Sequence, residues 1–212
     1  MKTRLILLFT VLSLGILSCS KYPADTGRLT EDFVVYTKYN TANNFQQYTT
    51  FAIVDSIDYI SPKDSGRYLN PQISGLLERI SSNMVARGYT KVSHDQQPDL
   101  GITVSAVKTT TTTVYYPGWY WDDPGYYNPY YWGYPGYGYY YPFYPTYISS
   151  YSAGSLIIDL IDFKNPTPDN KYAVEWSVFI RALLTGNHTD SQIQTAIDQA
   201  FTQTPAIKKT SK

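Results

Sequence analysis

The spacing of apolar residues along the first half of the chain predicts two strands followed by a helix. Runs rich in β-branched and aromatic residues at 33–36 and 48–54 are typical of strands. Asn70 and Pro71 then fit the N-cap and the first residue of a helix. Its apolar stripe consists of Ile73, Leu76, Leu77, Ile80 and Met84. Gly88 lies just past the predicted end of this helix.

The second half predicts three longer strands and a closing helix. Apolar residues occupy every second position at 100–106 and again at 172–184, and the run 156–162 is apolar on both faces until Asp159 and Asp162. We expect 156–162 to be a central strand that pairs with 172–184 through a turn at 164–171. Thr189 and Gln192 fit a capping box, and the helix should stop before Pro205. Its apolar stripe consists of Ile193, Ala196, Ile197, Ala200 and Phe201.

These elements predict an α+β fold. We expect a mostly antiparallel β-sheet packed against two amphipathic helices, with a long Tyr/Gly/Pro-rich loop inserted between strands. The single domain should run from 32 to 206. A polar linker at 20–31 precedes it, and a polar tail at 207–212 follows it.

The first nineteen residues indicate a lipoprotein signal. Lys2 and Arg4 precede an apolar core at 5–17, which is shorter than the roughly 20 residues that span a bilayer. The core ends in Ile-Leu-Ser-Cys, which resembles a bacterial lipobox, and Cys19 is the one cysteine of the chain. We expect a lipid on Cys19 that holds the protein on the cell outer membrane, facing either the periplasm or the exterior. The alternatives are a cleaved secretory peptide with an incidental cysteine, or a transmembrane anchor.

Aromatic residues dominate 115–151, which holds fifteen of the 23 tyrosines together with six prolines and five glycines. That density of proline and glycine prevents a regular helix or a central strand. We therefore expect a long connection that projects from the sheet. Two interpretations stay open: a loosely packed low-complexity loop, or a contact surface for an envelope glycan or another envelope protein. The candidate ligand-binding residues are Trp119, Trp121, Tyr126, Tyr130, Trp132 and Tyr137.

Charge argues against nucleic acid as a partner. Seventeen basic and seventeen acidic residues cancel, and 115–151 contains neither lysine nor arginine. Binding of single-stranded nucleic acid needs a basic groove beside its stacking rings. Asp122 and Asp123 instead make the aromatic tract slightly acidic, and we interpret them as solvated turn residues.

The remaining polar residues predict neither catalysis nor a metal or cofactor site. His94 and His188, the two histidines, lie in polar stretches and are too few to bind zinc. Asp159 and Asp162 lie three apart on a predicted strand, hence on opposite faces, so they cannot form a simple catalytic pair. We expect a non-enzymatic protein. A hydrolase whose site is assembled from residues scattered in sequence is the enzymatic alternative.

Several short motifs occur in an order that resembles the DUF4136 lipoproteins, a family of bacterial envelope proteins of unknown function. They are Phe45–Ala52 (FQQYTTFA), Ala86–Tyr89 (ARGY), Pro98–Leu100 (PDL), Gly154–Asp159 (GSLIID) and Trp176. The resemblance covers about 33–205. It implies an α+β fold in a lipid-anchored protein of a Gram-negative envelope. It transfers no catalytic residue.

Overall fold

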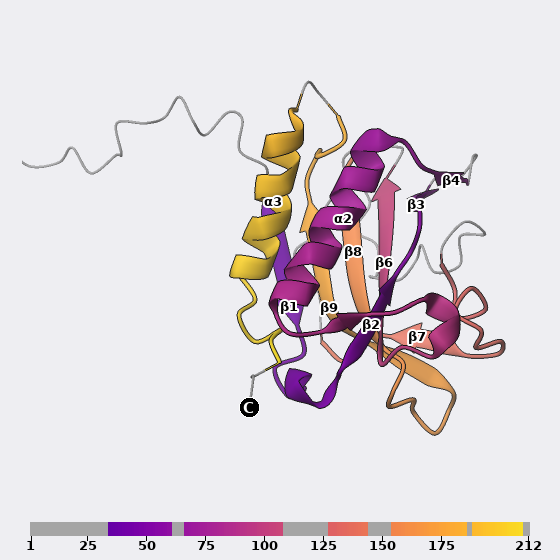
Figure 1. Cartoon of the computed structure of the whole chain (residues 1–212). Helices are drawn as coiled ribbons and strands as arrows, with labels where there is room; N and C mark the ends of the chain where they lie inside the picture. The colour runs from indigo at the N-terminus through magenta and orange to yellow at the C-terminus, as the bar shows by residue number, and fades with distance from the viewer. Residues whose placement is uncertain (1–33, 61–65, 108–126, 144–153, 186–187, 210–212) are drawn as a thin grey trace, which may run out of the picture. The chain divides into compact units, whose positions relative to one another are not determined.

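The computed structural model describes residues 34–60, 66–107, 127–143, 154–185 and 188–209 (Figure 1). The predicted signal with Cys19, the linker, and the candidates Trp119, Trp121 and Tyr126 lie outside these described residues. The strands are β1 (Val35–Tyr39), β2 (Thr50–Ile53), β3 (Ile57–Ile60), β4 (Arg67–Tyr68), β5 (Thr90–Lys91), β6 (Leu100–Val107), β7 (Gly138–Tyr140), β8 (Leu156–Asp162) and β9 (Lys171–Ile180). The helices are α2 (Pro71–Ala86) and α3 (Asp190–Thr202), with short 3-10 turns η2 (Phe45–Gln47) and η3 (His94–Gln96).

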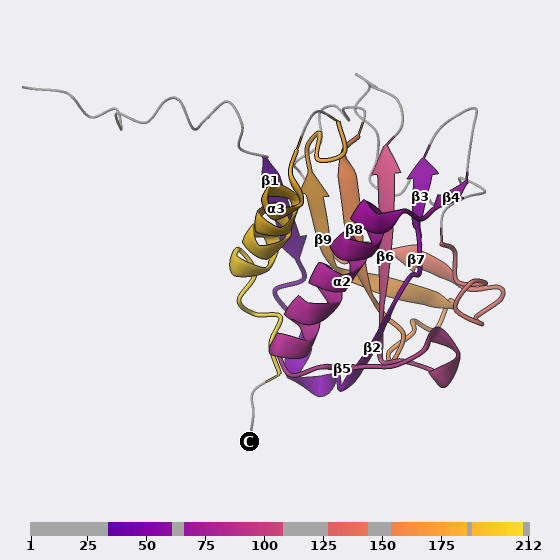
Figure 2. The ribbon, with the colours of Figure 1, turned by 45° about the horizontal axis from the view of Figure 1, so that its top comes forward.

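The nine described strands form one sheet in the order β1-β9-β8-β6-β2-β5, with β3 also beside β6, β4 beside β3, and β7 beside β9. Figure 2 shows α2 and α3 on the same face of this sheet. The fold is α+β as predicted, but the prediction of a mostly antiparallel sheet was wrong, because the sheet is mixed. Strand β6 runs parallel to β2 and β3 and antiparallel to β8. The reason is that α2 lies between β3 and β6 in the chain, and such a crossover returns the chain to run in the same direction.

Both helices begin where local capping signals predict. The Asn70 side chain accepts a 2.9 Å hydrogen bond from the Ile73 amide at the start of α2. Thr189 and Gln192 form the capping box of α3. All ten apolar residues that define the two predicted stripes are buried. The helices are therefore held to the sheet by the faces that the sequence marks as apolar.

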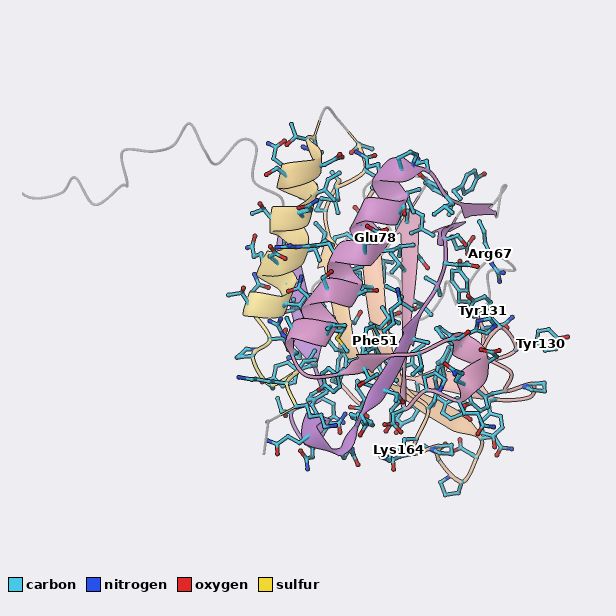
Figure 3. The ribbon with its side chains drawn as sticks, in the orientation of Figure 1. Phe51, Arg67, Glu78, Tyr130, Tyr131 and Lys164 are labelled. Atoms are coloured by element: carbon cyan, nitrogen blue, oxygen red, sulfur yellow. The ribbon has the colours of Figure 1, made fainter. Side chains whose placement is uncertain are left out.

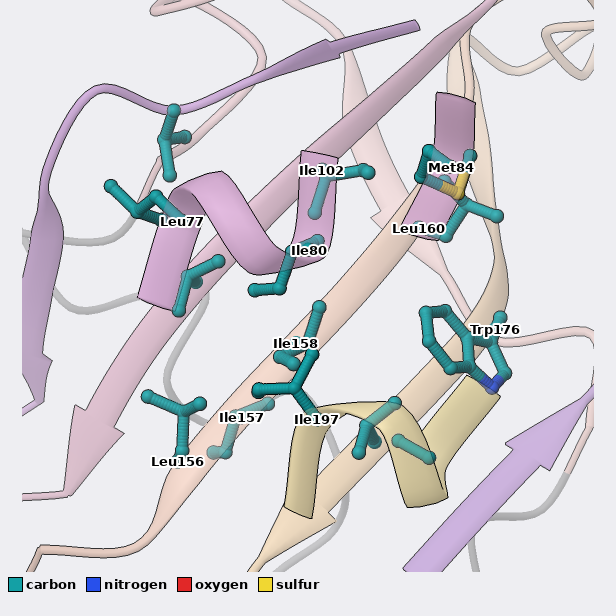
Figure 4. Close-up of a cluster of buried hydrophobic side chains, with 14 of the residues drawn as sticks. Leu77, Ile80, Met84, Ile102, Leu156, Ile157, Ile158, Leu160, Trp176 and Ile197 are labelled. Atoms are coloured by element: carbon teal, nitrogen blue, oxygen red, sulfur yellow. The ribbon is translucent and has the colours of Figure 1, made fainter. Parts of the chain in front are cut away.

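The main core lies between the helices and the central strands (Figure 4). Ile80 of α2 lies near Ile102 of β6, and Ile197 of α3 lies near Ile158 of β8. Trp176 is fully buried, with its ring centre 4.9 Å from that of Phe201. Its indole N–H donates to the Thr204 hydroxyl at 3.0 Å, so the one polar atom of this large ring is satisfied.

The second face of the sheet is also covered, which the alternating pattern of β6 does not predict. Every residue of β6 and of β8 is buried, including the polar Thr103 and Ser105. Part of the cover comes from the aromatic tract. Residues 127–143 pack back onto the domain and supply β7, which pairs with the start of β9. Over this part, the expectation of a projecting loop was wrong.

Two predicted boundaries shift in the structure. Strand β9 ends at Ile180 rather than continuing to Leu184, because Ala182 takes a left-handed backbone conformation with φ of 54°. At the other end of the domain, Ile207 lies in the predicted polar tail yet is fully buried. The packed domain therefore extends past 206.

Candidate functional site

Three rings of the described aromatic segment are buried in the core, those of Tyr127, Trp132 and Tyr139. The Tyr127 hydroxyl donates to the Ser56 carbonyl at 2.8 Å, and the Tyr139 hydroxyl donates to the Tyr127 carbonyl at 2.9 Å. The candidate Trp132 is only 3% exposed, and its ring centre lies 5.2 Å from that of Phe163. Burying such rings stabilises a fold by several kcal/mol each, roughly. These residues therefore attach the segment to the sheet.

Tyr137, another candidate, lies between core and surface. Its ring stacks on Tyr172 of β9 with centres 4.8 Å apart and planes 17° from parallel. Tyr134 packs against the same Tyr172 ring at 5.1 Å. One face of the Tyr137 ring is thus already occupied by the domain itself.

Tyr130 differs from these neighbours because its side chain is 75% exposed. It occupies the tip of a hydrogen-bonded turn: its amide donates to the Asn128 side-chain oxygen at 3.0 Å, and the Gly133 amide donates to its carbonyl at 3.1 Å. The Tyr134 amide closes the turn by donating to the Pro129 carbonyl at 2.9 Å. Gly133 takes a φ of 84°, a conformation that few residues other than glycine adopt. The backbone that carries the Tyr130 ring is therefore held in one conformation.

Arg67 lies against the same turn (Figure 3). Its guanidinium carbon is 4.5 Å from the ring centre of Tyr127 and 4.9 Å from that of Tyr131. The His94 ring stacks on Tyr131 at 5.2 Å, with the planes 22° apart. Contacts of a guanidinium with tyrosine faces are attractive, because the ring face carries partial negative charge. Burial raises the pKa of both Tyr127 and Tyr131, so these rings stay neutral and the stack carries the positive charge of Arg67.

We name Arg67, His94, Tyr127, Tyr130 and Tyr131 the Tyr130 site. Strand β4, turn η3 and the turn 127–134 bring these five residues together. Of the six ligand-binding candidates from the sequence, Tyr130 belongs to this site, Trp132 and Tyr137 lie in the packed segment beside it, and three lie outside the described residues. Arg67 was missed because no local motif marks an arginine that will stack on rings far along the chain. His94 is exposed, and no local pattern in the sequence indicates its stacking on Tyr131.

The two aspartates of β8 have separate partners. Asp162 accepts hydrogen bonds from the Tyr48 hydroxyl at 2.7 Å, the Lys164 amide at 2.8 Å and the Asn165 amide at 3.1 Å. Asp159 accepts from the Tyr141 hydroxyl at 3.2 Å. Asp162 therefore binds the amides of the turn that follows β8.

Glu175 is a third buried carboxylate, at an irregularity of the sheet. The pairing between β8 and β9 shifts there, so Glu175 is an extra residue on β9, as in a β-bulge. Burial first, and then the charge of Asp162, raise the pKa of Glu175. Hydrogen bonds from the side chains of Asn40 and Asn43 lower the pKa of Glu175 and so offset part of this rise.

Within the described part of the chain, no cluster of three or more histidine, cysteine or acidic side chains could hold a metal ion. None of the helices in that same part is both long enough and apolar enough to cross a membrane.

Comparison with known proteins gives a family and a related structure. The family described as "Domain of unknown function (DUF4136)" matches residues 35–206. The crystal structure of a DUF4136 family protein from Bacteroides thetaiotaomicron is 32% identical to this chain, with a TM-score of 0.72, and the match covers 84% of this chain and 99% of that one.

Two structures of the PelC dodecamer from Paraburkholderia phytofirmans also match, with TM-scores of 0.41 and 0.40. They are 10% and 12% identical to this chain, and each match covers 84% of this chain and 99% of the other. No curated protein sequence matches the chain.

Proposed function

Because the chain belongs to the DUF4136 family, whose function is unknown, we propose that it is a lipid-anchored cell-envelope protein that binds glycan and catalyses no reaction. The proposal has two parts, an anchor at Cys19 and a contact surface at the Tyr130 site. The sequence supports the first part and the geometry supports the second.

The anchor is supported by the order of charged, apolar and lipobox residues that ends at Cys19. A lipidated N-terminal cysteine carries more than one acyl chain, and each buried methylene adds about 0.8 kcal/mol to membrane binding. Several chains together hold a protein far more firmly than a single one. The cell outer membrane is the location we propose.

The observation that carries the binding proposal is the 75% exposure of Tyr130 on a hydrogen-bonded turn whose other rings are buried or half-buried. An exposed ring on a fixed backbone loses little conformational entropy when it binds. Tyrosine also offers a flat apolar face with a polar edge, and a sugar ring has matching apolar faces edged with hydroxyls. The Tyr130 ring is therefore suited to stack on a saccharide.

A glycan suits this surface better than a protein does. The large apolar side chains that are exposed among the described residues are spread over separate elements instead of forming one patch. They are Val34, Tyr36, Tyr68, Leu69, Val85 and Tyr130. Stable protein interfaces instead bury a contiguous surface with an apolar centre. Arg67 and His94 contact the adjacent Tyr131, and the Asn128 side chain bonds to the Tyr130 amide, so groups that can bond to sugar hydroxyls lie on or beside the same turn.

The test is retention of the full-length chain, kept in detergent, on purified cell wall and envelope polysaccharides. We expect the parent protein and a Tyr36→Ala control to be retained and Tyr130→Ala to be lost. Tyr36 is a matched control because it is also an exposed tyrosine, 40% exposed, on β1 at the edge of the sheet. Equal retention of all three proteins would place the binding surface elsewhere. No retention of any would refute glycan binding and favour the interpretation in which the partner is another envelope protein.

A further inference from the structure

Arg67 has the properties of a pre-positioned anion receptor. It is exposed on β4, and its guanidinium is held against two neutral rings, those of Tyr127 and Tyr131. Among the described residues, the salt bridges involve Arg79, Lys164 and Lys171, but not Arg67. Its charge is therefore held in place without being neutralised by a described carboxylate.

Stacking leaves the N–H groups of the guanidinium available for hydrogen bonds. A guanidinium contacts rings through its flat faces, while its five N–H groups point outward in the plane. Two parallel N–H groups match the two oxygens of a carboxylate, and such charge-assisted pairs are among the strong hydrogen bonds. The fixed orientation also lowers the conformational entropy that Arg67 would lose on binding.

The nearby acidic side chain does not occupy this receptor. Asp55 directly precedes Ser56, whose hydroxyl lies 2.6 Å from the Tyr127 hydroxyl. Its carboxylate accepts the Ser56 hydroxyl at 2.8 Å and forms no described salt bridge with Arg67. The Asp55 carboxylate would repel a second negative group placed on its side of the rings. A ligand that brings a single carboxylate to Arg67 is therefore favoured.

We propose that the glycan bound at the Tyr130 site is acidic, with Arg67 binding the carboxylate of a uronic-acid-type sugar while the exposed Tyr130 ring stacks on another sugar of the same oligosaccharide. Tyr130 directly precedes Tyr131, whose ring contacts Arg67, but the Tyr130 side chain points outward from the turn (Figure 3), so an oligosaccharide of several sugar units is needed to meet both groups. The stacking of His94 on Tyr131 helps to hold that ring in place beneath the guanidinium. This inference rests on the proposed glycan binding and adds the chemical class of the sugar.

The test compares a tetragalacturonate with its methyl ester, which has the same rings without the charge. Both are titrated calorimetrically into the full-length chain in detergent, with Arg67→Gln, Arg67→Lys and Tyr130→Ala alongside. We expect the parent to bind the acid at least about tenfold more tightly than the ester, because a hydrogen bond to a charged group contributes roughly that much. Arg67→Gln should abolish the preference, because it weakens binding of the acid far more than binding of the ester.

The other variants separate charge from geometry. Arg67→Lys should keep only part of the preference, since an ammonium lacks the planar pair of donors. Tyr130→Ala should weaken binding of both sugars. Added salt should reduce the preference for the acid, because exposed charges are screened.

Three results would overturn part or all of this account. Equal affinity of the parent for acid and ester would refute the acidic class and leave glycan binding intact. An undiminished preference in Arg67→Gln would show that Arg67 is not the receptor. Binding of neither sugar by the parent would overturn the acidic class and glycan binding together. Circular dichroism of each variant would show that a loss of binding is not a loss of folding.

Discussion

The Tyr48 hydroxyl donates a 2.7 Å hydrogen bond to Asp162, which lies 114 residues later in the chain. Asp162 ends β8 and also accepts the Lys164 and Asn165 amides of the turn that leads to β9. Burial, and then the nearby Asp162 charge, raise the pKa of Tyr48, so its hydroxyl stays protonated and remains a donor. This contact ties the chain just before β2 to the β8–β9 turn.

Glu175 lies close enough to this network to make stability depend on pH. Its pKa is raised in the folded state, chiefly by burial, so the folded protein holds this proton more tightly than the unfolded chain does. The resulting stabilisation is present at pH values below the unfolded pKa and is lost as pH rises through the folded pKa. We expect Glu175→Gln to be more stable than the parent at neutral pH and to lose this part of the pH dependence.

The measurement is urea unfolding of both proteins at pH values from about 4 to 8. Asp169→Asn is the control, because Asp169 is exposed and pairs with Lys171 at the surface. Parallel stability curves for the parent and Glu175→Gln would show that Glu175 ionises as freely in the folded state as in the unfolded chain.

Trp132 and Tyr130 should respond in opposite ways to truncation, although they lie two residues apart. Trp132→Ala should lower the free energy of unfolding by about 3–5 kcal/mol, because it removes a buried ring that packs on Phe163. Tyr130→Ala should change it by no more than about 0.5 kcal/mol, since this ring is mostly in solvent. Chemical denaturation of the two variants checks both values. Similar effects of the two substitutions would mean that residues 127–143 are not packed as described.

Gly101 on β6 lies directly under the Phe163 ring. A Cβ at Gly101 would overlap that ring, so Gly101→Ala should destabilise the domain by about 1–3 kcal/mol through overpacking. Gly75 in α2 is the matched control, because a Cβ there would meet nothing within 4 Å. Gly75→Ala should stabilise by about 0.5–1 kcal/mol through helix propensity. Thermal unfolding distinguishes the two signs, and a neutral Gly101→Ala would contradict the close packing of Phe163 on the sheet.

Cys19→Ser tests the anchor separately from the domain. Without the thiol no lipid can be attached, so we expect the protein to leave the membrane fraction, and mass spectrometry should find no acylated N-terminal peptide. The parent should remain in the membrane fraction and yield the acylated peptide. If Cys19→Ser stays in the membrane fraction, attachment depends on something other than this cysteine.

Local signals allowed both helices to be predicted from sequence. Asn70 caps α2 through a residue three positions away, and the capping box of α3 spans Thr189 to Gln192. Strand direction could not be predicted in the same way, because alternation of apolar residues is identical in parallel and antiparallel strands. The direction of β6 depends on α2, which crosses over the sheet so that β6 starts at the same end as β2 and β3.

The Tyr130 site could be predicted only in part. Tyr130 and Trp132 are both aromatic and both lie among glycine and proline, so composition does not separate them. Their difference arises from contacts distant in sequence, with Phe163 burying Trp132 while Tyr130 has no such cover. The role of Arg67 could not be predicted either, because the rings that it contacts lie far along the chain, in the aromatic segment. Deleting the whole tract would therefore remove core residues along with the proposed surface, and point substitutions are the better test.

Site-specific nitration of tyrosine, mapped by mass spectrometry, tests the central claim most directly. In the free full-length chain, Tyr130 should react faster than the buried Tyr127 and Tyr139. A bound envelope glycan should protect Tyr130 and leave the reactivity of Tyr36 unchanged. Equal reactivity of Tyr127, Tyr130 and Tyr139, or a Tyr130 that reacts just as fast when glycan is bound, would contradict the account.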